Sequence, residues 1–249
     1  MFGLGTIINT LFVIIGSILG LFFKKGLREN VQDILMKASG IAILFIGISG
    51  VLSYMLTIEN GTIGTRGTML LIFSMTLGSL TGELLNIEGK IERFGLRLRD
   101  FFHARGDSSF IDGFVNTSLI ICIGAMAIVG AIEDGVHHDI STLTAKSVLD
   151  FVIVLVNASV YGKGVLCSAI PIFFYQGSIT VLAAAAGSFV SDTLITQLSF
   201  IGAALIFCIG INTTFGKIFK VGNMLPALFF PIFTFLLGYF FPAAANFFS

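Results

Sequence analysis

The chain has 249 residues, of which 55% are hydrophobic and only 11% are charged, and its mean hydropathy is +1.00. A soluble domain carries roughly 25% charged residues, so this chain has too little polar surface for a globule in water and belongs in a bilayer. Its net charge of zero leaves only local patches to recruit partners, and we expect no nucleic-acid partner and no cofactor.

A helix needs about 20 apolar residues to cross a hydrocarbon core of about 30 Å. Eight segments meet this requirement: 2–23, 38–56, 67–86, 113–133, 145–161, 165–190, 194–214 and 222–242. The count falls to seven if the sixth segment is re-entrant. The sequence therefore predicts an all-α polytopic membrane protein with a single transmembrane domain, 1–249.

Basic residues sort to one side of these segments. Only Arg66 and Lys146 fall on the other side. The remaining 12 of the 14 follow the first, third, fifth and seventh segments: Lys24, Lys25, Arg28, Lys37, Lys90, Arg93, Arg97, Arg99, Arg105, Lys163, Lys217 and Lys220. Cytoplasmic loops collect Lys and Arg, so we expect both termini outside the cytoplasm of a bacterial inner membrane. The Lys24-Lys25 pair follows the first segment, which favours a retained anchor over a cleaved signal peptide.

Small residues recur four apart in the first, third and sixth segments, as GSILG, GSLTG and GSFVS. Faces of this kind let two helix backbones approach closely in lipid. The glycines expected at such helix contacts, within the chain or between copies in a homo-oligomer, are Gly16, Gly20, Gly78, Gly82 and Gly187.

The cytoplasmic end of the third segment carries Glu83, which could bind a cation or carry a proton if it faces the bundle, or could reach to the interface instead. The basic loop that follows, 87–112, has apolar residues at three- and four-residue spacing, among them Ile91, Phe94 and Leu98. This pattern predicts an amphipathic helix on the anionic inner leaflet, and partner docking or gating is the alternative.

The outer end of the fourth segment reads AIEDGVHHD. Carboxylates and imidazoles together can hold a divalent metal, although no ligand spacing is recognisable here, and a solvated loop is the alternative. These weak metal candidates are Glu133, Asp134, His137, His138 and Asp139.

The fifth segment carries Lys146 and Asp150, four residues apart near its expected outer boundary, where an ion pair can form on one helix face. Asn157 lies deeper. The sixth segment reads AIPIFFYQGS, and we expect a break near Pro171 and Gly177.

Interrupted helices expose backbone groups that can bind an ion or a polar substrate, and a kinked packing helix is the alternative. The candidate substrate or ion ligands along the chain are Glu83, Asp150, Asn157, Tyr175, Gln176 and Ser178.

A second phrase also recurs: LFIGISG at 44–50, LIICIGAMAIVG at 119–130 and LIFCIGINTTFG at 205–216. Each copy follows a segment with the GS phrase. The units 67–161 and 165–242 would then be inverted copies, and matching the first three segments to the last three also reverses direction. Inverted repeats are typical of many transporters, whose substrate site lies near the middle of the bilayer.

Four stretches resemble a known family: GTIINTLFVIIGSILGLFF, CIGAMAIVGAIEDG, LTAKSVLDF and SAIPIFFYQGSITVLAAAAG. In this order they are similar to the bacterial YdfK/YqgA family of integral membrane proteins, a domain-of-unknown-function family. The resemblance covers nearly the whole chain. It implies a polytopic inner-membrane protein and assigns neither a substrate nor a catalytic residue.

We therefore expect a secondary carrier or permease for a small solute or ion, with the lipid bilayer as its surroundings. An ion channel is one alternative, and a non-transporting scaffold or sensor subunit that binds a partner through the basic loop is another. The sequence contains no HExxH, CxxC or GxxxxGK[ST] motif, so we expect no enzyme.

Overall fold

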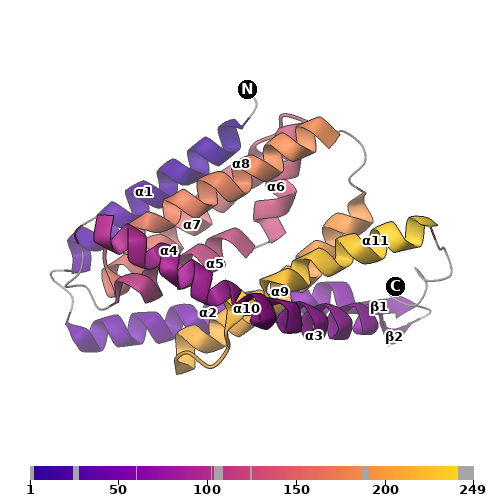
Figure 1. The fold of residues 1–249 in the computed structure, drawn as a ribbon, viewed down its shortest axis with the longest axis horizontal. Coiled ribbons are helices and arrows are strands. Elements are labelled where there is room, and N and C mark those ends of the chain that lie inside the picture. The colour runs from indigo at the N-terminus through magenta and orange to yellow at the C-terminus, as the bar shows by residue number, and fades with distance from the viewer. Residues whose placement is uncertain are drawn as a thin grey trace.

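The computed structural model describes residues 3–24, 28–59, 61–101, 103, 109–123, 125–186 and 191–240. These residues are mostly α-helical, and they include one short antiparallel hairpin in which Ile58 lies opposite Ile63 (Figure 1). In chain order the elements are α1 (Leu4–Lys24), α2 (Glu29–Met55), β1 (Leu56–Glu59), β2 (Thr62–Thr65), α3 (Thr68–Leu85), α4 (Ile87–Phe101), α5 (Phe110–Ile123), α6 (Ala125–Val136), α7 (Ser141–Tyr161), η1 (Leu166–Ser168), α8 (Ala169–Ala186), α9 (Asp192–Phe215), α10 (Val221–Met224), η3 (Leu225–Phe229) and α11 (Phe230–Phe240). The expected all-α polytopic architecture is confirmed.

Among the described residues, fewer helices qualify as membrane spans than the eight expected. Within the described residues, six helices are long and apolar enough to cross a membrane: α1, α2, α3, α7, α8 and α9. The consecutive helices α5 and α6 make a seventh candidate. The last expected span is divided among α10, η3 and α11. Its apolar helical part, Val221–Leu236, is shorter than the helices that qualify as membrane spans. Pro226, at the start of η3, cannot donate the hydrogen bond that would continue α10.

The expected break at Pro171 and Gly177 is wrong, because α8 continues from Ala169 to Ala186. Pro171 lies in the first turn of α8, where a backbone N–H has no acceptor within the helix, so the missing donor costs nothing there. The bend lies in the expected fourth span instead, where α5 and α6 meet at 56°.

Helix α1 packs along α7 through its small residues. A Cβ added at Gly16 would lie 2.7 Å from Val154 Cγ2, and one at Gly20 would meet the Leu155 carbonyl and Ala158. The GSILG phrase of α1 therefore serves close contact between these two helices.

Helix α2 packs along α9, and two of the three copies of the second repeated phrase, LFIGISG and LIFCIGINTTFG, meet in this contact. A Cβ at Gly47 would lie 2.6 Å from Phe207 N, and one at Gly210 would lie 2.7 Å from Leu44 N. Farther along, Gly50 meets Ala203. Residue numbers rise along α2 as they fall along α9, so the helices are antiparallel. The glycine of each phrase therefore lies against the first residues of the other phrase.

Helix α3 packs against α10 and η3. Its GSLTG phrase places Gly78 against Ala227 and Gly82 against the Asn223 carbonyl. The third GS phrase begins at Gly187, which lies outside the described residues.

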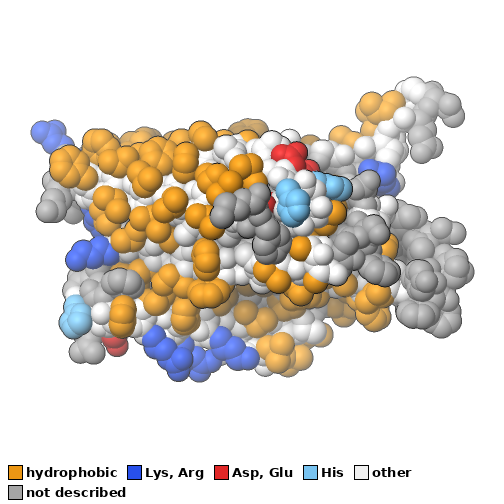
Figure 2. All heavy atoms as spheres, turned by 90° about the horizontal axis from the view of Figure 1, so that it is seen from above, with side chains coloured by type: hydrophobic (Ala, Val, Ile, Leu, Met, Phe, Trp, Pro, Cys, Tyr) orange, Lys and Arg blue, Asp and Glu red, His pale blue; other side chains and the backbone are white. Residues whose placement is uncertain are grey.

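Large apolar side chains cover much of the outer surface (Figure 2). Phe45, Phe174 and Leu182 are each about two-thirds exposed, at 68%, 68% and 67%. A monomeric protein in water rarely exposes apolar area on this scale, whereas lipid is a good solvent for it. The surface therefore fits the hydrocarbon region of a membrane.

The ends of α1, α3, α7 and α9 gather at one end of the bundle, where Gly20 of α1 lies against Ala158 of α7 and Lys220 reaches Glu83 of α3. Gly164 lies against Phe110 at the start of α5, and Gly222 lies against Glu88 in α4. Gly40, in the first half of α2, lies against Thr214 at the end of α9. We call this the basic end, since Lys37 of α2, Lys90 of α4 and the loop residues Lys163, Lys217 and Lys220 belong to the segments that meet here.

Candidate functional site

Polar side chains follow one face of α7. Lys146, Asp150, Asn157 and Tyr161 are separated by four or seven residues, which places them on the same side of the helix. Because α7 begins at Ser141, earlier than the span expected at 145–161, Asp150 lies close to its midpoint rather than near its outer end. The polar partners come from α1, α5 and α8.

Lys146 and Asp150 form a buried network with two amide side chains near the middle of the bundle. Lys146 Nζ binds Asp150 Oδ2, and both residues are only 4% exposed. Asn9 of α1 donates to Asp150 Oδ2 at 3.0 Å and to Gln176 Oε1 of α8 at 3.0 Å. Asn9 and Gln176 are fully buried. We call Asn9, Lys146, Asp150 and Gln176 the central network.

The central network retains unused hydrogen-bonding capacity. Asn9 Oδ1 and Gln176 Nε2 are buried and have no partner within the described part of the chain. A buried polar atom without a partner costs about 1–3 kcal/mol, so two of them beside an ion pair weigh against a purely structural role. One is an acceptor and the other a donor, which suits a small polar solute or a water molecule.

On the side away from the basic end, the network gives way to hydroxyl groups and a helix cap. Thr6 Oγ1 and Thr180 Oγ1 lie 3.5 Å apart, and both residues are buried. Asp134, at the end of α6, accepts hydrogen bonds from Gly3 N at 3.2 Å and Gly5 N at 3.1 Å. Its carboxylate therefore caps α1, where the helix dipole favours negative charge.

Toward the basic end, the polar face of α7 leads to a cavity. Asn157 donates to Thr117 Oγ1 of α5 at 3.1 Å, and both residues are buried. Tyr161, one turn farther, lines a cavity of about 420 Å³ that also touches the first turns of α2 and α5 and the end of α9. We call this the basic-end cavity. Its charged lining residues are Asp33, Lys37, Glu88, Glu92, Asp112 and Lys217.

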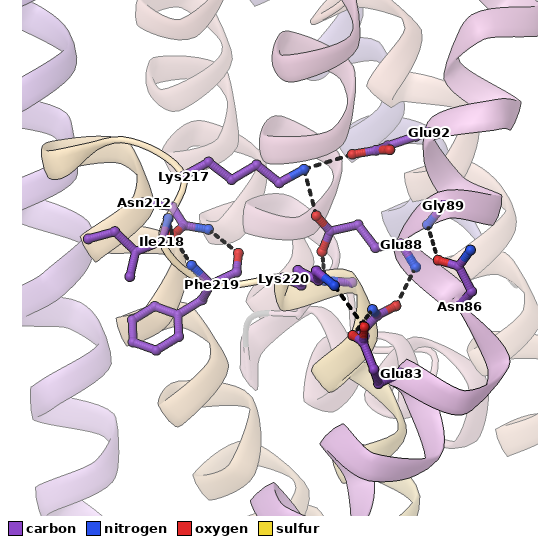
Figure 3. Close-up of polar contacts among 12 residues, drawn as sticks. Glu83, Asn86, Glu88, Gly89, Glu92, Asn212, Lys217, Ile218, Phe219 and Lys220 are labelled. Carbon is purple, nitrogen blue, oxygen red and sulfur yellow. Dashed lines mark hydrogen bonds and ion pairs between the residues drawn. The ribbon is translucent and has the colours of Figure 1, made fainter.

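The loop between α9 and α10 borders this cavity and is fastened to α3 and α4 (Figure 3). Lys217 reaches Glu88 and Glu92 at 2.7 Å each, and Lys220 reaches Glu83 at 2.7 Å. Asn212 accepts from Ile218 N and Phe219 N and donates to the Phe219 carbonyl.

Both lysines in this loop hold their charge firmly. Burial alone would lower the pKa of Lys217, but its hydrogen bonds to Glu88 and Glu92 outweigh that effect and raise the pKa to about 12. The hydrogen bond to Glu83 also raises the pKa of Lys220. Any stability that these pairs contribute is present below the ordinary lysine pKa and lost only as the pH rises through the folded value, so the loop stays fastened at neutral pH.

The structure separates the candidate ligands. Asp150 and Gln176 meet in the central network, and Asn157 lies farther along α7 toward the basic end. Tyr175, beside Gln176 in sequence, lines an apolar pocket instead. Ser178 is exposed and donates to the carbonyl of Tyr175. Glu83 is largely exposed at the basic end, 2.6 Å from Asn223 Nδ2, so it is not part of the central network.

The weak metal candidates do not form a site. Among the described residues, no three His, Cys, Asp or Glu side chains are close enough to hold a metal ion. Asp134 caps α1, while His137 and His138 are exposed. Asp139 accepts from Ser141 N at 2.9 Å, and this bond lowers the pKa of its carboxyl group.

The sequence does not predict two features of the site. Asn9 lies within the first apolar segment, but the sequence does not show that it joins Asp150 to Gln176, since those bonds depend on α1 lying beside both α7 and α8. The basic-end cavity is also missed, because it is lined by short stretches of six helices. Its charged residues are far apart in the sequence, since Lys37 belongs to α2, Glu88 and Glu92 to α4, and Lys217 to the loop after α9.

Comparisons with known proteins agree with this architecture. The family model described as "Protein of unknown function (DUF554)" matches residues 4–236. The chain is 33% identical over 227 residues to the "Uncharacterized membrane protein YdfK" of Bacillus subtilis (strain 168), covering 91% of this chain and 93% of that protein. It is 28% identical over 229 residues to the "Uncharacterized protein YqgA" of Escherichia coli (strain K12), covering 90% and 93%. No solved structure matches it.

Proposed function

The chain belongs to the DUF554 family, and from this premise we propose that it is a membrane carrier for a small polar solute or ion, with the central network as its binding site. The observation that carries the proposal is the buried Lys146–Asp150 pair, close to the midpoint of α7 and bound through Asn9 to Gln176. Ionisable groups inside the membrane are costly and usually mark a transport path.

The chemistry of the pair suits exchange. A bound cation or a proton can replace Lys146 at Asp150, and an anion can replace Asp150 at Lys146. In either case one charge of the pair needs a new partner, since an isolated buried charge is strongly unfavourable. The spare acceptor on Asn9 and the spare donor on Gln176 lie in the same network and could bind the polar part of the solute.

The polar face of α7 supplies a route to one side of the membrane. Asn157 and Tyr161 continue the row from Asp150 to the basic-end cavity, and apolar Val154 forms a barrier between Asp150 and Asn157. By the distribution of Lys and Arg, we place this cavity on the cytoplasmic side of a bacterial inner membrane, with both termini outside.

Helix pairing supports an inverted repeat of α1–α3 and α8–α11. Within this scheme α1 meets α8 through Asn9 and Gln176, and α2 meets α9 through reciprocal glycine contacts. In the two phrases Gly47 corresponds to Gly210, and Leu44 corresponds to Phe207. An interface with two-fold symmetry repeats each contact between the corresponding residues, and the contacts of Gly47 with Phe207 and of Gly210 with Leu44 are such a pair. These contacts support this matching rather than units 67–161 and 165–242. In it, Asn9 of α1 meets Gln176 of α8 between the two repeats, beside the ion pair of α7.

Flux measurements test the proposal. The full chain would be reconstituted into liposomes that contain a pH-sensitive dye, and monovalent cations, carboxylates and amino acids would be added one at a time. A carrier gives solute-dependent flux that saturates with concentration. We expect Asp150→Asn and Gln176→Ala to lower the saturable flux at least about tenfold, because each removes a group of the central network.

Ser178→Ala is the matched control, since Ser178 lies on α8 with Gln176 but is exposed. Wild-type flux in Asp150→Asn would refute the role of the central network. Conductance that does not saturate would identify a channel. No flux over the whole panel, together with a co-purifying partner, would favour the scaffold.

A further inference from the structure

A second pocket lies beneath α4, away from the central network. It has a volume of about 400 Å³ and apolar walls from α4, α5, α8 and η3. Its lining includes Phe114, Ser118 and Cys122 of α5, each one turn from the next, so the wall extends about 12 Å along that helix. Tyr175 also lines it. The pocket is therefore elongated and runs from α4, at the basic end, toward the interior of the bundle.

Lys90 also lines this pocket and is exposed at the first turn of α4. Arg93 and Arg97 follow at helical spacing on the same flank. None of the three makes an ion pair within the part of the chain that the structure describes, unlike Glu88 and Glu92, which bind Lys217. Positive charge thus stands uncompensated beside an apolar pocket.

We propose that this pocket binds one anionic phospholipid of the surrounding bilayer, with an acyl chain between α4, α5 and α8 and the phosphate at Lys90. The apolar walls match a hydrocarbon chain, and the lysine matches the charge of the headgroup. The pocket volume falls in the range of small-molecule sites. Basic pockets between helices on the cytoplasmic side of membrane proteins recognise anionic headgroups in this way.

Native mass spectrometry of the full chain, released from nanodiscs, can count the lipids that remain bound. The probes are phosphatidylglycerol and phosphatidylcholine with identical acyl chains. We expect one phosphatidylglycerol to be retained in preference to phosphatidylcholine. Lys90→Ala should weaken that binding about fivefold, since one Lys beside anionic lipid contributes about that factor. Ser118→Leu should displace the lipid by filling the pocket.

Arg97→Ala is the matched control, because it removes the same charge from α4 without touching the pocket. Equal losses in Lys90→Ala and Arg97→Ala would show general attraction to the membrane surface and overturn the proposal. Equal retention of the two lipids would also overturn it, as would displacement by soluble glycerol phosphate, which carries no acyl chain. A variant is compared only if its helical circular dichroism and gel-filtration profile match the wild type, and if Ser118→Leu fails that criterion, Lys90→Ala decides alone.

Discussion

At the scale of single residues, the unusual feature is a lysine and an aspartate that neutralise each other inside an apolar bundle. Their spacing of four residues is visible in the sequence, which correctly suggests an ion pair. The depth of this ion pair within the bundle is not visible in the sequence, because α7 begins at Ser141, before the span of 145–161 that hydropathy indicates. The partners Asn9 and Gln176 are 167 residues apart, so no local pattern links them.

The ion pair predicts a non-additive response to mutation. Lys146→Met and Asp150→Leu should each lower the free energy of unfolding by about 3–5 kcal/mol, because each leaves one buried charge without its partner. The double variant should recover most of this loss, since it removes both charges. Denaturant unfolding in detergent measures the effect, with Lys37→Met as the control from an exposed pair. Additive losses would mean that the pair is not coupled.

At the scale of elements, composition and hydropathy predict most of the helices but misplace the interruption. Pro171 looks like a break in the sequence, yet it lies in the first turn of α8, where proline is tolerated. The bend between α5 and α6 lies within a segment that reads as one apolar span. Hydropathy reports how apolar a segment is, whereas its path depends on the helices packed beside it.

Two glycine substitutions distinguish a close contact between helices from the break expected near Gly177. Gly47→Ala should destabilise the protein by about 1–3 kcal/mol, because its Cβ would lie 2.6 Å from Phe207 N and push α2 from α9. Gly177→Ala should be neutral or mildly stabilising, since its Cβ would meet only Thr6 Cγ2 at 4.0 Å and alanine favours the helix. Thermal unfolding in detergent compares them, and a large loss in Gly177→Ala would indicate that α8 needs a glycine there.

At the scale of the whole molecule, three antiparallel helix contacts relate the two ends of the chain. They join α1 to α8, α2 to α9 and α3 to the segment from α10 to α11. Repeated phrases in the sequence suggest duplication, and these contacts support the matching of repeats that we propose. Rocking of one half against the other would open the central network alternately to each side.

Access from each side of the membrane tests this account most directly. Single cysteines would replace Thr180 and Asn157, which flank the central network, in a chain where Cys122, Cys167 and Cys208 are alanine. A membrane-impermeant maleimide would be added to right-side-out and inverted vesicles, with Asp139→Cys and Lys217→Cys as surface controls. We predict that Thr180→Cys reacts only from outside and Asn157→Cys only from the cytoplasmic side. Protection of both cysteines from both sides, or reaction of both from one side, would contradict alternating access.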